Sequence, residues 1–269
     1  MEIFNTLVVY PLTNLLVAVY QVLLFLHVPY ALGFAIIGLT IVIRLILYPL
    51  INSQLKASKK MQDLAPHISN VKEKHKDDKK RIQEETMKLY KEHGVNPAAG
   101  CLPTLIQLPI LWGLYSVLNN LVHKSPDELV NYINSIVIEP LQLSAPWETT
   151  FFGIPLGQSP QQLLSVMPVV AIAIPFLTGF FQFIQSKMMF YAPPGATTAK
   201  KNDDFASVFQ KQAVYIFPIM IGFFSFNFPF GLSLYWITFS IFGIIQQYKI
   251  SGPGGLIDLW QKAKKLQKR

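Results

Sequence analysis

The chain has 269 residues, of which 51% are hydrophobic and 14% are charged, and its formal net charge is +8. Soluble domains carry about 25% charged residues, so this composition excludes an ordinary soluble protein and indicates an integral membrane protein. The single cysteine excludes an intrachain disulfide, and we expect no cleavable signal sequence because the first residues lack a basic stretch.

The first apolar segment, residues 7–28, is interrupted by Pro11, Asn14 and Gln21. Asn14 and Gln21 are seven residues apart, so they share one face of a helix. This pattern fits a helix that lies on the membrane surface, or an additional span. No lysine or arginine flanks the segment, so charge does not decide between the two. We favour an extracytoplasmic surface helix within residues 1–30.

The first predicted span covers residues 33–55. About twenty apolar residues cross the hydrocarbon core of a bilayer as an α-helix, and this stretch carries one charge, Arg44, near its middle. A guanidinium at that depth costs about 2.5–3.5 kcal/mol on insertion scales, and it normally faces a protein interior or a water-filled cavity. We therefore predict a hydrated, positively charged pocket. The alternative is that Arg44 reaches an interface or pairs with another helix.

Residues 56–96 are hydrophilic and hold eleven of the lysines and arginines. Residues recur at helical spacing on both sides of a polar stretch: the apolar Met61, Leu64, Ile68 and Val71 before it, and Ile82, Thr86 and Leu89 after it. This pattern favours a helical hairpin with a thin apolar seam over a simple charged loop. Pro66 is expected in the first turn of a helix, where its missing N–H does no harm.

Four further spans are predicted, at about residues 101–122, 162–184, 212–228 and 231–248. All but two of the 23 lysines and arginines lie in the hairpin, in the loop 186–211 and in the tail that follows the last span and includes the basic run 251–269. Basic loops stay on the cytoplasmic side, and these three segments share a side when there are five spans. The chain therefore has an extracytoplasmic N-terminus and a cytoplasmic C-terminus in this prediction.

Three polar or aromatic side chains of the spans lie at similar depth. Counting from the cytoplasmic ends places Arg44, Gln107 and Trp236 roughly 15–18 Å into the membrane at about 1.5 Å per residue. We predict that they line one cavity. The alternatives are a hydrogen bond between helices for Gln107 and ordinary packing for Trp236.

Enzymatic chemistry has no visible location in the sequence. No Asp or Glu falls within the predicted spans, and no phosphate-binding glycine loop, nucleophile motif or zinc-protease motif occurs. The five histidines show no metal-ligand spacing; they are His27, His67, His75, His93 and His123. We expect no enzyme, no cofactor and no metal.

Three stretches of the sequence resemble the YidC-type membrane protein insertases, relatives of the mitochondrial oxidase-assembly and thylakoid insertases. They are TIVIRLILYPL at 40–50, KLYKEHGVNPAAGCLPTLIQLPILWGLY at 88–115 and GLSLYWITFSIFGIIQQY at 231–248. The resemblance implies an all-α membrane protein, with a five-helix transmembrane bundle in residues 31–250, an N-terminal interfacial helix and a mobile cytoplasmic hairpin. It also implies groove positions for Arg44, Gln107 and Trp236.

The function that we expect is insertion and folding of newly made membrane proteins, without nucleotide hydrolysis, through a groove open to the cytoplasm and to lipid. The expected partners are nascent membrane proteins, membrane lipids and the ribosome, which the basic tail and the hairpin would contact, with a Sec-type translocon as a further candidate. The tail could instead bind anionic lipids. We expect a monomer in the plasma membrane. The rival functions are an assembly chaperone or scaffold and a small-solute channel; five spans without matching halves count against the channel.

Overall fold

The computed structural model describes residues 2–75, 78–95, 102–189 and 212–257. The chain forms two compact units, each built from three stretches of sequence. Unit 1 comprises Met1–Ile46, Thr104–Gln182 and Ile219–Phe242, and unit 2 comprises Leu47–Pro103, Phe183–Pro218 and Gly243–Arg269.

Unit 1 begins with an almost unbroken apolar helix. Its parts are α1 (Glu2–Phe4), η1 (Asn5–Val9) and α2 (Tyr10–Phe25), and α2 packs against α3 (Ala31–Ile46). The turn between α2 and α3 is tight, because His27 and Tyr30 both adopt positive φ, at 56° and 55°.

The segment after α6 (Leu102–His123) is folded rather than open. It contains α7 (Pro126–Asn134), η3 (Glu139–Leu141), the strands β1 (Thr150–Phe151) and β2 (Ile154–Pro155), and α8 (Pro160–Leu163). The strands pair antiparallel around Phe152 and Gly153, which both have positive φ, as a two-residue hairpin turn requires. The side chain of Asn14 bonds to this segment on both of its polar atoms: Nδ2 donates to the carbonyl of Ile136, and Oδ1 accepts from the N–H of Ile138.

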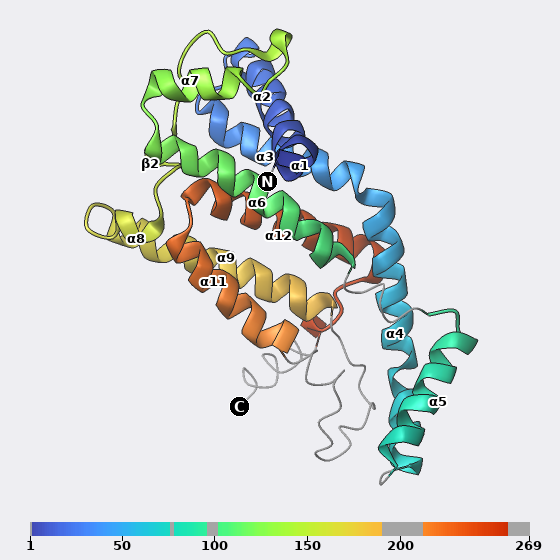
Figure 1. Ribbon diagram of the computed structural model, residues 1–269. Helices are drawn as coiled ribbons and strands as arrows, with labels where there is room; N and C mark the ends of the chain where they lie inside the picture. The colour runs from blue at the N-terminus through green and yellow to red at the C-terminus, as the bar shows by residue number, and fades with distance from the viewer. Residues whose placement is uncertain (1, 76–77, 96–101, 190–211, 258–269) are drawn as a thin grey trace. The chain divides into compact units, whose positions relative to one another are not determined.

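Parts of three apolar helices complete unit 1: α9 (Pro168–Met189) up to Gln182, α11 (Phe217–Asn227) from Ile219, and α12 (Phe230–Ser251) up to Phe242. The other residues of these helices belong to unit 2, as does η4 (Gln212–Ile216), which precedes α11. In Figure 1, α9 and α11 lie side by side. A Cβ at Gly222 would lie 3.2 Å from the carbonyl oxygen of Pro175, so the two backbones approach closely, as small residues allow in membranes. Ser225 links α11 to both neighbours, through Thr178 at 3.2 Å and Ser233 at 2.7 Å.

The core of unit 1 is mostly aliphatic, and its buried aromatic side chains are Tyr20, Trp147, Phe151, Phe230 and Tyr235. Apolar side chains are also exposed on the outer faces of α9 and α11, among them Phe176, Ile219 and Phe223. An apolar exterior of this kind suits a lipid environment. The largest fully buried side chains of the unit are Leu16, Val17, Leu32, Ile36, Leu39, Leu114, Val117, Leu118, Ile133, Leu156 and Tyr235.

Unit 2 contains the predicted helical hairpin, formed by α4 (Tyr48–Lys74) and α5 (Lys79–Glu92), which pack against each other (Figure 1). Asp78 caps α5, since its side chain accepts a hydrogen bond from the N–H of Arg81. The structure confirms the seam, because each of its residues is buried or half-buried: Met61, Leu64, Ile68, Val71, Ile82, Thr86 and Leu89.

The root of the hairpin is attached to the end of α9. The carbonyl of Met189 accepts hydrogen bonds from the Ser58 hydroxyl at 3.3 Å and from the Gln62 amide at 2.6 Å. Gln247 of α12 reaches the carbonyl of Met188 at 3.5 Å. The last carbonyls of a helix have no partner within the helix, so these side chains supply one.

The structure corrects three details of the sequence prediction. We expected one helix over residues 33–55, but α3 ends at Ile46 and α4 starts at Tyr48. Pro49 has no N–H to bond to the carbonyl of Leu45, and its ring crowds that carbonyl, so the helix is interrupted and Pro49 lies in the first turn of α4. Pro66 lies inside α4 and not in a first turn. The third predicted span, from residue 162, starts as a helix only at Pro168, after the separate turn α8.

Three helices of the described residues are long and apolar enough to cross a membrane: Glu2–Phe25, Pro168–Met189 and Phe230–Ser251. A fourth is added if Ala31–Ile46 and Tyr48–Lys74 count as one interrupted span, and Gln212–Asn227 is apolar but shorter. A helix therefore coincides with each predicted span, while the number five stays a prediction.

Candidate functional site

Arg44 lies in the last turn of α3 and is 2% exposed. Its Nη2 donates a hydrogen bond to the backbone carbonyl of Phe239 in α12, at 2.6 Å. The guanidinium carbon also lies 3.5 Å from the centroid of the Phe239 ring and 6.0 Å from that of Phe242. The arginine is therefore held by a single turn of α12.

The described residues offer Arg44 partial negative charge and no carboxylate. The carbonyl of Phe239, the face of its ring and the negative end of the α3 dipole all favour a cation there. A guanidinium has five N–H donors, and the Nε of Arg44 is buried without a hydrogen-bond partner among the described residues. A buried donor left unpaired costs about 1–3 kcal/mol, so an additional acceptor would bind favourably.

Gln107 makes a hydrogen bond between helices. Its Nε2 donates to the hydroxyl of Tyr235 at 2.7 Å, and Tyr235 is fully buried in α12. The ring of Tyr235 stacks near that of Phe239, with centroids 6.0 Å apart. Gln107 thus makes the hydrogen bond between helices that the sequence offered as the alternative. It also connects to Arg44 through the neighbouring rings of Tyr235 and Phe239.

Trp236 points to a different helix. Its Nε1 donates to Oε1 of Gln182 in α9 at 2.8 Å, and the hydroxyl of Ser240 lies 3.5 Å from the same oxygen. No hydrogen bond or ring contact joins Trp236 to Arg44 or Gln107 within the described part of the chain. All three predicted residues nevertheless contact residues 235–240 of α12 or belong to them.

Sequence reasoning missed Tyr235, Phe239 and Gln182. Tyr235 and Phe239 are four residues apart, so helical spacing alone could have paired them on one face of α12. Gln182 was not considered because the third predicted span ended at residue 184, which placed Gln182 close to the end of that span. The helix continues to Met189, so Gln182 lies well inside it.

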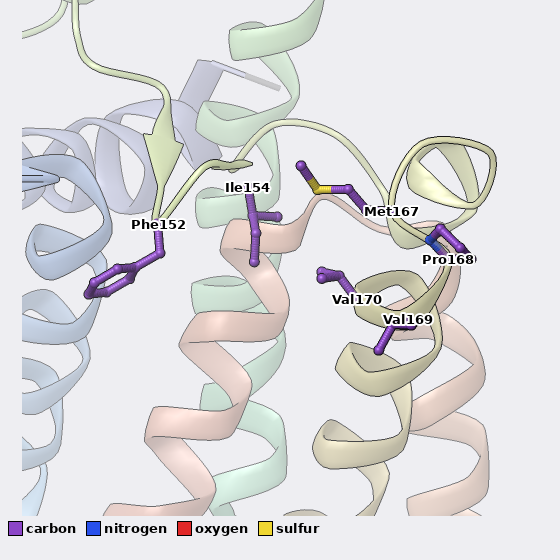
Figure 2. A pocket seen from close by; sticks show the side chains of 6 residues that line it. All are labelled: Phe152, Ile154, Met167, Pro168, Val169 and Val170. Carbon is purple, nitrogen blue, oxygen red and sulfur yellow. The ribbon is translucent and has the colours of Figure 1, made fainter.

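A separate apolar pocket of about 390 Å³ lies between the β1–β2 turn and the start of α9 (Figure 2). It shares no residue with the contacts around Arg44. All the residues that line it have apolar side chains: Phe152, Ile154, Met167, Pro168, Val169 and Val170. Within the described ranges, no group of three or more His, Cys, Asp or Glu residues could hold a metal ion.

Comparison with known proteins identifies the class. The family model described as "60Kd inner membrane protein" matches residues 23–253. The chain is 37% identical over 225 residues to the membrane protein insertase MisCA of Bacillus subtilis, which covers 82% of this chain and 70% of that protein. It is 34% identical over 222 residues to the membrane protein insertase YidC of Fusobacterium nucleatum, covering 82% of this chain and 87% of that protein.

The similarity extends to chloroplasts. The inner membrane protein ALBINO3 of Arabidopsis thaliana is 36% identical over 242 residues, which cover 85% of this chain. The matched region spans about half of that relative, 48% of its length.

The helices, the apolar exterior and the buried arginine define a multi-pass, helical membrane protein. The chain belongs to the YidC-type family of membrane protein insertases. Insertases are not catalytic, so membership of this family, and not any missing motif, confirms that the chain is not an enzyme. The resemblance stated from the sequence is confirmed as well.

Proposed function

We propose that this chain inserts newly made membrane proteins, and that Arg44 attracts the acidic flank of a client into a hydrated groove lined by Arg44, Gln107 and Trp236. The observation that carries the proposal is a buried guanidinium whose described partners are a carbonyl and an aromatic ring. Such a cation can still bind an anion through a donor that has no described partner, the Nε of Arg44. The membership of an insertase family supports the same function.

The physical driving forces need no nucleotide. Attraction between opposite charges strengthens as the effective dielectric falls below that of water, so a groove inside the membrane favours capture. The apolar segment of the client then moves into lipid, which contributes about 25 cal/mol per Å² of buried apolar surface. A potential of 100 mV, negative inside, adds about 2.3 kcal/mol for each negative charge moved outward.

The hairpin α4–α5 faces the cytoplasm in this proposal, because it carries the largest cluster of basic residues. It is the element that meets a client first. The ribosome and a Sec-type translocon are further proposed partners. The basic tail proposed for the ribosome lies mostly outside the described residues, which end at Ile257.

Reconstituted vesicles test the proposal with a single-span client whose translocated flank is acidic. We expect Arg44→Ala to reduce insertion strongly and Arg44→Lys to preserve most of it, because Lys keeps the charge. The matched client, with each Asp replaced by Asn, should be insensitive to both changes. Equal insertion by all three proteins would remove the electrostatic role, and solute flux without insertion would favour a channel.

A further inference from the structure

The guanidinium of Arg44 already has an internal partner on two of its surfaces. Phe239 supplies its backbone carbonyl to Nη2 at 2.6 Å, and the centroid of its ring lies 3.5 Å from the guanidinium carbon. One residue therefore contacts the cation with both its main chain and its side chain.

These contacts occupy part of the surface that a client carboxylate can use. A carboxylate binds a guanidinium best with two parallel hydrogen bonds, and the edge formed by Nε and Nη2 is one place for them. Nη2 is bonded to Phe239, while Nε has no partner among the described residues. The ring face is the negative side of the aromatic quadrupole, so it stabilises the cation and repels an incoming anion.

The ring of Phe239 is itself fixed in place. Tyr235 lies one turn earlier in α12 and its ring is nearly parallel, at an interplanar angle of 25°. Tyr235 is fully buried, and Gln107 donates a hydrogen bond to its hydroxyl. The aromatic cover over Arg44 is thus a supported arrangement of α12 and α6.

The geometry points to Phe239 as a specificity-determining residue that competes with the client for Arg44. It weakens the hold of the arginine on a carboxylate, so that an acidic flank is captured reversibly and a neutral polar flank does not displace the ring at all. This inference rests on the proposed function, because it concerns how strongly the same arginine binds a client.

A substitution of Phe239 separates the effect of the aromatic ring from that of the backbone carbonyl. Phe239→Leu keeps the backbone carbonyl and most of the apolar volume but removes the aromatic face. Phe223 in α11 is the matched control, because it is 65% exposed and its described ring contact is with Phe224. Phe223→Leu makes the same chemical change away from the arginine.

The first measurement uses no client. An arginine-selective dicarbonyl reagent is applied to the full chain in lipid nanodiscs, and modification of Arg44 is followed by mass spectrometry. We expect Phe239→Leu to accelerate modification about threefold or more, given the strength of cation–π contacts in desolvated sites, and Phe223→Leu to leave the rate unchanged. An unchanged rate in Phe239→Leu would overturn the inference.

The second measurement is the Kd of a fluorescent single-span peptide, with an Asp flank or the matched Asn flank, for the same nanodiscs. We expect Phe239→Leu to tighten binding of the Asp peptide about threefold, to leave the Asn peptide unchanged, and to have no effect in an Arg44→Ala background. Equal tightening for both peptides, or tightening without the arginine, would contradict the competition. If modification accelerates but Arg44→Ala binds the Asp peptide as well as the unaltered chain does, the inferred cover stands and the proposed function fails.

Discussion

Tyr235 is the residue through which Gln107 reaches the arginine. Its hydroxyl accepts the hydrogen bond of Gln107 at 2.7 Å, and its ring stacks near Phe239. Helical spacing and depth counting placed Gln107 near this level of the bundle, but neither specifies which side chain an amide will bond. That choice depends on how α6 and α12 pack, which a single sequence does not define.

A double-mutant cycle measures this hydrogen bond. Tyr235→Phe removes the hydroxyl and Gln107→Leu removes the amide, and each should lower the free energy of unfolding by about 0.6 kcal/mol and at most about 1.7 kcal/mol, the range for hydrogen bonds between membrane helices. Because both changes remove one interaction, the double variant should cost little more than either single one. The measurement is unfolding in mixed micelles. Fully additive losses would show that the two side chains act independently.

Glu128 and Ser125 form a capping box at the start of α7, outside the candidate spans. The N–H of Ser125 donates to the Glu128 carboxylate at 2.9 Å, and the N–H of Glu128 donates to the Ser125 hydroxyl at 3.4 Å. Hydrogen bonds from the backbone and side chain of Ser125 lower the pKa of Glu128 below its usual value of 4.5. The folded helix therefore favours the ionised form of the Glu128 carboxyl group.

The pH dependence of this cap has a definite sign. A carboxylate with a lowered pKa in the folded state stabilises at neutral pH, and its contribution disappears as the pH falls through that lowered value. We expect hydrogen-exchange protection of the first turn of α7, relative to the Glu128→Gln variant, to persist through mildly acidic pH and then to vanish. A constant difference between the two proteins down to strongly acidic pH would refute the role of the charge.

At the scale of elements, the sequence predicted the hairpin well and the first span less well. The hairpin has a seam at regular spacing, a polar turn and a capping Asp78, and these local signals agree with one another. Residues 33–55 are mostly apolar, so average hydropathy favours one helix and gives no weight to Pro49. Pro49 lacks the N–H that the helical hydrogen-bond ladder needs at that position, and the helix is interrupted at Leu47.

Gln62 provides a test of how α4 is anchored to the end of α9. Its amide donates to the carbonyl of Met189 at 2.6 Å, near the negative end of the α9 dipole. Gln62→Glu removes the donor and adds a negative charge, so it should loosen both segments more than Gln62→Ala does. Hydrogen exchange at residues 58–62 and 186–189 should accelerate severalfold. Asn70→Glu, at an exposed position of the same helix, is the control and should change neither segment.

At the scale of the whole molecule, charge distribution and family membership agree on a multi-pass membrane protein. The basic segments predicted the orientation, and the apolar exterior of α9 and α11 fits a lipid environment. The contacts of Arg44 with Phe239 and of Trp236 with Gln182 could not be predicted in the same way. They join residues far apart in the chain, and no local pattern records such pairs.

The placement of the N-terminal helix determines on which side of the membrane the chain begins. Glu2–Phe25 is long and apolar enough to span a membrane, but we predict that it lies on the outer surface. Asn14 bonds to Ile136 and Ile138, and Gln21 bonds to the carbonyl of Gln142 at 3.3 Å. The two side chains are about 10 Å apart along the helix at 1.5 Å per residue. A helix that contacts the loop 136–142 through both Asn14 and Gln21 runs parallel to that loop. A helix that crosses the membrane would move away from a loop on the surface, so only one of the two contacts could form.

Thiol labelling distinguishes these arrangements. In a Cys101→Ser background, single cysteines are introduced by Glu2→Cys, Asp127→Cys and Lys80→Cys and exposed to a membrane-impermeant maleimide on intact cells. A surface helix places residue 2 on the same side as residue 127, so both should label while residue 80, in the basic hairpin, should label only after lysis. A spanning helix would instead protect residue 2 together with residue 80. If residue 2 were protected in this way, Asn14 and Gln21 could not both keep their hydrogen bonds to the outer loop. That result would therefore also contradict the packing of α2 on residues 136–142.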